Sequence, residues 1–178
     1  MKKFLFWLFM ACVVLLGVYA LWTITHHAST PRVTASVAES LPAHKAGPDS
    51  YYPNPEQTPG DVVTTDEKVV CEPGYAGSVR HVTRSEKVMV YGWYGLSFPQ
   101  AKGAYEFDHF ISLELGGSND PKNLWPEPAE PTPGFHEKDV VENYLHHEVC
   151  VTHSITLLEA QREIRTDWYA VYLRIQNQ

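Results

Sequence analysis

The sequence predicts a mixed α+β domain, a ββα unit with an added C-terminal helix, preceded by one N-terminal transmembrane helix. Three observations predict this fold class. An uncharged apolar run lies near the N-terminus, two short segments rich in β-branched and aromatic residues enclose a polar loop, and apolar residues in the C-terminal part repeat at helical spacing. At 178 residues, the chain has room for one ordinary domain and none for a large multidomain enzyme.

The first predicted element is a membrane anchor. The 21 residues Phe4–Ile24 carry no charge and would form a helix of roughly 30 Å, about one hydrocarbon thickness. Because Lys2 and Lys3 precede this run, the positive-inside rule places the anchor in the cytoplasmic membrane and exports the rest of the chain to the periplasm or the cell exterior. Two alternatives stay open: a signal peptide cleaved at Val18-Tyr19-Ala20, which would release a secreted protein, and a lipoprotein signal ending at Cys12.

A linker follows the anchor. Residues 26–60 hold six of the 13 prolines among Ala, Ser and Thr, without sustained apolar periodicity, which is typical of a tether. The predicted organisation is therefore an anchor over residues 1–25, a linker over 26–60 and one domain over 61–178. Residues 26–178 carry 12 basic and 21 acidic side chains, a formal net charge of −9, which excludes a generic nucleic-acid binder. Binding of phosphate by this domain would therefore need a local site, and a metal ion is the favoured component of that site.

Strands are predicted where β-branched and aromatic residues gather between turn signals, over Val88–Tyr91 and over Tyr105–Leu113. Leu124–Trp125 predicts a third, short strand that ends at Pro126. Four prolines from Pro126 to Gly134 exclude regular structure in that stretch.

Two helices are predicted in the C-terminal part. The first begins at His136 and runs into Cys150, with apolar residues spaced by three and four at Val140, Val141, Tyr144, Leu145 and Val149. The second follows Thr156, which forms a capping-box pattern with Glu159. Its apolar stripe consists of Leu157, Ala160, Ile164, Trp168, Val171 and Tyr172.

Cys71 and Cys150 are the only cysteines outside the apolar run. Export would place them in a compartment where disulfides persist. A bridge between them closes a loop of about 80 residues and contributes roughly 4 kcal/mol in the chain-entropy model. We therefore predict a disulfide, with two buried free thiols as the alternative.

The segment with the clearest chemical pattern is Tyr105–Pro126. It places an Asp108-His109 pair on a predicted strand, a Gly116-Gly117 turn after it, and Asn123 14 residues beyond the histidine. This order predicts a strand, loop, strand hairpin with polar groups at one end. The helix that carries His136 then completes a ββα unit.

This pattern resembles the HNH endonucleases, a branch of the ββα-metal (His-Me finger) nucleases, and looks like a subfamily found in small exported bacterial proteins. The resemblance covers most of residues 71–172. It is carried by Asp108-His109, Leu113-Glu114-Leu115-Gly116-Gly117, Asn123-Leu124-Trp125-Pro126, Lys138-Asp139, Leu145-His146, Val149-Cys150, Ala160-Gln161 and Asp167-Trp168. It implies a metal-dependent endonuclease that hydrolyses DNA, with RNA as an open alternative.

Phosphodiester hydrolysis needs a base for water, a cation for the developing charge and a group that holds the base. His109 suits the base, because an imidazole has an ordinary pKa of about 6.5. Asp108 suits a hard divalent cation. Adjacent residues on a regular strand point to opposite faces, so the strand is expected to bulge or end at this pair. The resemblance assigns Asn123 to orienting the base, with metal contact as the alternative role.

The remaining metal ligand is left open between two residues of the predicted helix. The resemblance favours His136, while Glu142 is the competing carboxylate; Lys138 and Glu142 would alternatively form a surface ion pair. Mg²⁺ or Mn²⁺ is the expected ion and Zn²⁺ an alternative. A basic cluster is the candidate phosphate contact, with a solvated face as the competing interpretation; its residues are Arg80, Arg84 and Lys87.

A second hypothesis belongs to another functional class. The chain would be a non-catalytic envelope module that keeps the ββα scaffold for binding a protein or for structure. The open choice of the third metal ligand and the acidic net charge favour this hypothesis, whereas the occurrence of Asp108, His109 and Asn123 in one segment favours the nuclease.

Overall fold

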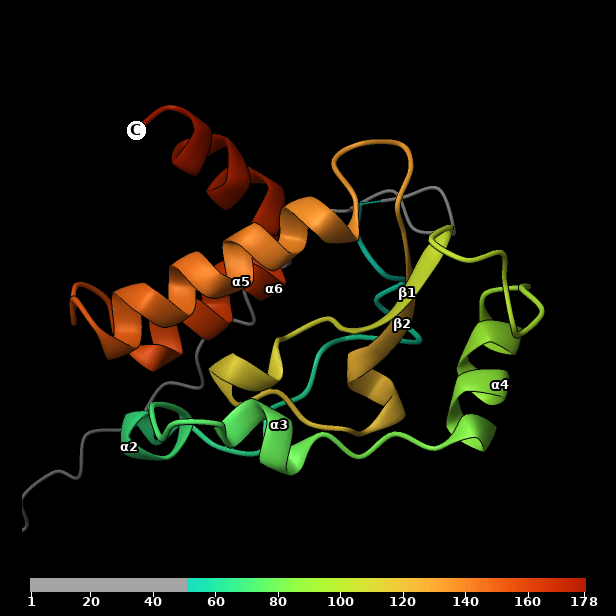
Figure 1. The fold of residues 1–178 in the computed structure, drawn as a ribbon, viewed down its shortest axis with the longest axis horizontal. Coiled ribbons are helices and arrows are strands. Elements are labelled where there is room, and N and C mark those ends of the chain that lie inside the picture. The colour runs from blue at the N-terminus through green and yellow to red at the C-terminus, as the bar shows by residue number, and fades with distance from the viewer. Residues whose placement is uncertain (1–50) are drawn as a thin grey trace, which may run out of the picture. The chain divides into compact units, whose positions relative to one another are not determined.

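The structure is a computed structural model that describes residues 51–178. The described chain is mixed α+β, which confirms the predicted fold class at this level (Figure 1). In chain order its elements are α2 (Glu67–Val70), α3 (Tyr75–Val79), α4 (Arg84–Trp93), β1 (Tyr105–His109), η1 (Leu113–Leu115), η2 (Pro121–Asn123), β2 (Leu124–Pro128), α5 (Phe135–Cys150) and α6 (Leu157–Gln176). The anchor predicted over residues 1–25, and most of the predicted linker, lie outside the described residues. Within residues 51–178, no helix has the length and apolar composition to cross a bilayer.

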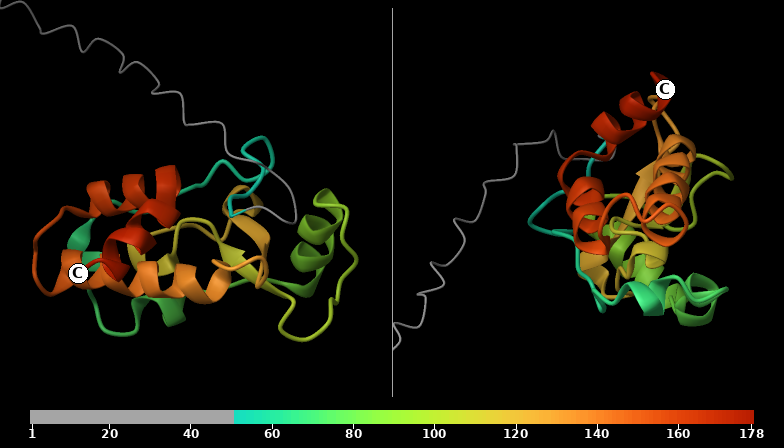
Figure 2. Two further views of the ribbon diagram at one scale, coloured as in Figure 1. Left: turned by 90° about the horizontal axis from the view of Figure 1, so that it is seen from above. Right: turned by 90° about the vertical axis from the view of Figure 1, so that its left-hand side faces the viewer.

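The sheet is a single antiparallel hairpin of β1 and β2. Its register sets Asp108 opposite Trp125 and His109 opposite Leu124. Figure 1 shows α4 on one side of this hairpin and α5 with α6 on the other, and the left view of Figure 2 shows the same order. A two-stranded hairpin is only marginally stable alone, so these helices supply the burial that it lacks. Every residue of β2 is buried as a result.

The strand predicted over Val88–Tyr91 is wrong, because these residues form the middle of α4. Thr83 starts this helix with a capping box: its hydroxyl accepts from the Glu86 N–H, and the Glu86 carboxylate accepts from the Thr83 N–H. Burial along α4 follows a helical face rather than alternation, since Val90 and Tyr91 are both buried. The cap and the packed face override the strand preference of the β-branched residues.

The two hairpin strands also end at places other than those expected. β1 stops at His109 instead of reaching Leu113, and the 3-10 helix η1 follows after a short turn. An end at the Asp108-His109 pair is one of the two distortions that the sequence predicted there. β2 continues through Pro126 to Pro128, whereas Pro126 was expected to end it. Proline is tolerated in this position because a two-stranded sheet has only edge strands.

The two C-terminal helices are confirmed. α5 runs from Phe135 to Cys150, and α6 begins after Thr156 with the predicted capping box. α6 bends at Asp167, whose backbone angles are not helical. The two helices pack against each other and bury an apolar core with residues Leu145, Val149, Ala160, Ile164 and Trp168.

The structure contains the predicted disulfide. It joins Cys71, the C-cap residue of α2, to Cys150, the last residue of α5, with 5.4 Å between the two Cα atoms. The bridge therefore fixes the C-terminal end of α5 to a segment that precedes the hairpin. The two free thiols considered as the alternative are not found.

Candidate active site

The candidate site lies where the end of β1 meets the first turns of α5. β1 places Asp108 and His109 at its last two positions, and both side chains are buried. The Asp108 side chain contacts α5, while the His109 ring contacts the loop between η1 and η2. The two neighbours therefore meet different partners, as adjacent residues of a regular strand do, whereas the sequence predicted a distortion that would bring both side chains into one site.

The His109 ring is held through one nitrogen. Its Nε2 atom lies 3.1 Å from Asn119 Oδ1. The amide of Asn119 is itself oriented, because its Oδ1 accepts from the His81 N–H at 3.1 Å and its Nδ2 donates to the Val79 carbonyl at 2.8 Å. An amide oxygen cannot donate, so the neutral His109 ring carries its proton on Nε2.

The other ring nitrogen, Nδ1, is left as an acceptor. It is buried and has no hydrogen-bond partner among the described residues. Burial lowers the pKa of His109 to about 4, while the negative charge of Asp108 and the Asn119 hydrogen bond oppose that shift. The positive charges of Arg80 and Lys138 lower the pKa further. The imidazole is therefore neutral and proton-accepting at neutral pH.

Asp108 is bound by a buried lysine from α5. Lys138 Nζ lies 2.6 Å from Asp108 Oδ2 and 3.0 Å from the His109 carbonyl oxygen, and it also forms an ion pair with Glu142, one turn later on the helix. Glu127 of β2 places Oε2 3.8 Å from the same ammonium. Lys138 is thus surrounded by three carboxylates and one carbonyl at the junction of β1, β2 and α5.

Burial and the neighbouring charges shift the pKa values of all four side chains in this cluster. Burial opposes the charged form of both Lys138 and Asp108, yet the carboxylates raise the pKa of Lys138 well above its ordinary value, and the ammonium lowers the pKa of Asp108. Burial raises the pKa of Glu142 to about 7, and burial with the charge of Asp108 raises the pKa of Glu127 well above its usual range. The Lys138–Asp108 pair is therefore ionised at neutral pH.

Asn123 holds the loop between the two strands. Its Nδ2 donates to the carbonyls of Ile111 and Ser118 at 2.9 Å each, and its Oδ1 accepts from the N–H groups of Ile111 at 2.9 Å and Asp61 at 3.3 Å. All four partners are backbone atoms. These contacts need a close approach of the chain at Gly117, where a Cβ atom would lie 1.8 Å from the Ile111 carbonyl oxygen.

The expected metal ligands do not come together in the structure. His136 is exposed, and its ring packs on Phe135 with 4.1 Å between the ring centroids. Asp108 and Glu142 both bind Lys138 instead. In residues 51–178, no group of three or more His, Cys, Asp or Glu side chains is arranged to hold a metal ion. The pair of α5 residues that faces the hairpin is Lys138 and Glu142, which the sequence had offered only as a surface ion pair.

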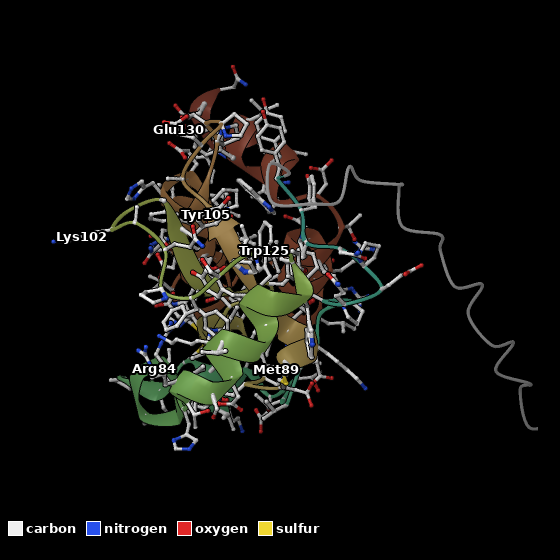
Figure 3. The ribbon with its side chains drawn as sticks, turned by 90° about the vertical axis from the view of Figure 1, so that its right-hand side faces the viewer. Arg84, Met89, Lys102, Tyr105, Trp125 and Glu130 are labelled. Atoms are coloured by element: carbon white, nitrogen blue, oxygen red, sulfur yellow. A yellow bond between two sulfur atoms is a disulfide. The ribbon has the colours of Figure 1, made fainter. Side chains whose placement is uncertain are left out.

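The three basic residues proposed as phosphate contacts divide into two groups. Arg80 is exposed and lies near enough to His109 for its charge to lower the pKa of the ring. Arg84 and Lys87 belong to α4, which Figure 3 shows in front of Trp125 of β2. Arg84 lies over the Phe98 ring and Lys87 over the Phe107 ring, at 5.3 and 5.6 Å from the ring centroids. Of these three basic residues, Arg80 is the one whose charge acts on His109.

Sequence patterns did not identify three residues of this site. Asn119 stands in a Gly-Ser-Asn-Asp stretch that is typical of an ordinary turn. Glu127 stands between two prolines, in a stretch expected to lack regular structure, and Lys138 has the spacing of an exposed helical ion pair. Their signal in the sequence is weak: Asn119 and Glu127 lie within a few residues of a motif that carries the family resemblance, and Lys138 belongs to such a motif, but the resemblance gave none of them a role.

The arrangement combines a neutral imidazole with an unpaired acceptor, a carboxylate fixed beside it, and an exposed guanidinium nearby. An imidazole of this kind accepts a proton only from a water molecule that reaches Nδ1, which is buried here, while an exposed guanidinium can hold an anionic group. Comparison of the chain with protein-family models, curated proteins and solved structures finds no match.

Proposed function

We propose that this protein is an endonuclease that hydrolyses phosphodiester bonds of DNA, with RNA as an alternative substrate, and that residues 1–25 tether it to the cytoplasmic membrane with the domain outside. The observation that carries the proposal is the His109 ring, whose Nε2 is tied to Asn119 while Nδ1 stays an unpaired acceptor. The chain order β1, β2, α5, with His109 at the end of β1, supports the ββα core of the HNH nucleases that the sequence resembles.

In the proposed reaction, His109 Nδ1 takes a proton from a water molecule as the water oxygen attacks phosphorus. The bond from phosphorus to the leaving sugar oxygen breaks, and that oxygen takes a proton from solvent. Asp108 favours the imidazolium that forms, because its negative charge raises the pKa of His109. Arg80 contacts the phosphate and offsets part of its charge.

The resemblance also implies a divalent ion, with Mg²⁺ or Mn²⁺ first and Zn²⁺ second, and this stays a prediction. The residues present do not fit it. The carboxylates of Asp108 and Glu142 are taken by the Lys138 ammonium, and His136 is exposed against Phe135. No step above therefore uses a metal ion.

Cleavage of a supercoiled plasmid tests the proposed base. The full-length chain, purified in detergent, is incubated with plasmid in Mg²⁺, Mn²⁺, Zn²⁺ or EDTA. We expect cleavage by the wild type and a loss of about 100-fold or more in His109→Ala, as for removal of a general base. His109→Asn keeps more of the buried volume if the alanine variant does not fold. His147→Ala, an exposed residue of α5, is the matched control and should cleave like the wild type. Cleavage that persists in both folded His109 variants would contradict the proposal.

The non-catalytic envelope module is the second candidate function, and a specific observation favours it. His109 is only 1% exposed, and its Nδ1 has essentially no contact with solvent. In addition, Lys138 takes the carboxylates expected for a metal. A module of this kind would show no plasmid cleavage by the wild type in any of the four solutions, so the same assay separates the two functions.

A further inference from the structure

At the junction of β1, β2 and α5, the side chains of Asp108, Glu127 and Glu142 surround the buried Lys138 ammonium; we call this cluster the pocket. Lys138 is 1% exposed, and so is Glu127. The Asp108 and Glu142 side chains are 9% and 14% exposed. Burying a lysine at this depth is costly unless its charge is paired and its N–H groups are bonded.

Every donor of this ammonium is used. A lysine ammonium has three N–H groups, and Nζ meets three acceptors: Asp108 Oδ2 at 2.6 Å, the His109 carbonyl at 3.0 Å, and Glu142 Oε1. Glu127 is a fourth neighbour at 3.8 Å, and neither of its oxygens accepts a hydrogen bond from the described residues. The pocket therefore holds one more carboxyl group than the ammonium can bond, and burial with the charge of Asp108 raises the pKa of this group, Glu127, well above its usual range.

Mg²⁺ and Mn²⁺ also prefer oxygen ligands, and three carboxyl groups surround Nζ, but among the described residues they are not arranged to hold a metal ion while the ammonium lies between them. A divalent ion cannot bind Asp108 and Glu142 while Lys138 lies between them. The Asp108 and Glu142 oxygens that it would need are already bonded to Nζ, and the ammonium would repel the ion at close range.

We propose that the Lys138 ammonium is a built-in cation, held where the family resemblance places a divalent metal ion, and that it excludes such an ion from the pocket. The ammonium ties β1 to α5 and keeps Asp108 ionised beside His109. The inference concerns occupancy of the pocket, so it holds whether or not the chain cleaves nucleic acid.

Manganese binding to the full-length chain tests this inference, with free Mn²⁺ measured by electron paramagnetic resonance. Lys138→Ser removes the ammonium and keeps the three carboxyl side chains. We expect this variant to bind one Mn²⁺ with a Kd at least about tenfold lower than that of any Mn²⁺ bound by the wild type. Adding Glu142→Gln to Lys138→Ser should abolish the gain. Lys122→Ser, at an exposed lysine, is the matched control and should bind like the wild type.

Two results would overturn the inference. One is a folded Lys138→Ser variant that gains no Mn²⁺ binding. The other uses no lysine variant, so it applies even if Lys138→Ser does not fold: Mn²⁺ binding by the wild type that is lost in Asp108→Asn would show that the native pocket takes the metal. We expect wild type and Asp108→Asn to bind Mn²⁺ equally weakly. Because this experiment measures ion binding, its result is independent of whether the protein cleaves the plasmid, and the inference and the proposed function can be contradicted separately.

Discussion

At the scale of single residues, two asparagines of the loop between β1 and β2 have different structural roles. Asn123 bonds only to backbone atoms and holds the shape of the loop. Asn119 bonds to the His109 ring, and it is oriented by the backbone of Val79, the last residue of α3, and of His81, which follows that helix. The ring nitrogen that carries the proton is therefore decided by contacts with a part of the chain that lies outside the hairpin.

The position of the ring proton is a testable consequence. In ¹⁵N NMR spectra of the wild type at neutral pH, we expect His109 to carry its proton on Nε2 with Nδ1 unprotonated. Asn119→Ala removes one hydrogen bond to the base, so we expect about tenfold lower kcat, near 1.4 kcal/mol, with little change in KM. Asn119→Gln keeps an amide and should retain part of the activity. A wild-type ring protonated on Nδ1 would exclude the proposed role of that nitrogen as the base.

At the scale of elements, α5 is held near both ends by contacts with distant parts of the chain. Lys138, in its first turns, bonds to β1, and Cys150, its last residue, is joined to Cys71 beside α2. Both attachments act on one rigid helix of 16 residues. A change in the disulfide is therefore expected to affect the position of α5 as well as the stability of the domain.

Removing the disulfide should destabilise the domain strongly. We expect Cys71→Ser with Cys150→Ser to lower the free energy of unfolding by about 4 kcal/mol, because the unfolded chain regains the freedom of a loop of about 80 residues. Urea denaturation of the full-length chain measures this change. In unreduced wild type, maleimide should label Cys12 alone, and a Cys12→Ser variant should take up no label. Labelling of that variant without reduction would contradict the bridge.

At the scale of the whole described domain, buried tyrosines from separate segments meet one core. Tyr52 precedes α2, whereas Tyr91 and Tyr94 lie at the end of α4. Tyr52 packs near Trp168 and Tyr94 near Trp125, at 6.2 and 6.4 Å between ring centroids. Burial is the main cause that raises the pKa of each of the three, and it raises that of Tyr91 to about 12.

These tyrosines predict a loss of stability in alkali. A raised pKa in the folded state means that the unfolded chain loses its phenol protons first, at about pH 10. The stabilisation is therefore complete below about pH 10 and is lost as the pH rises above it. Denaturation measured from about pH 8 to about pH 11.5 should show this fall. Tyr91→Phe should reduce it, and an unfolding free energy that stays constant over this range would contradict the prediction.

Much of this architecture follows from patterns that are local in the chain. The two C-terminal helices show their apolar spacing and, for α6, a capping box. Only two cysteines lie outside the apolar run, so the sequence allows one disulfide pairing between them. The Asp108-His109 pair, the Gly116-Gly117 turn and Asn123 marked the hairpin. Local patterns failed at the ends of β1 and β2 and at α4, where a cap and a buried face overrode the strand preference of Val88 and its neighbours.

The partners of the site residues, by contrast, come from tertiary structure. Asn119 reaches the backbone near Val79 across about 40 residues, and Lys138 meets Asp108 across 30. Whether an ion pair such as Lys138 with Glu142 faces water or a pocket depends on which side of α5 packs against the hairpin. Lys138 and Glu142 lie one turn apart on the same face of α5. Only the packing of β1 and β2 against that face buries the Lys138 ammonium instead of leaving the pair exposed to water.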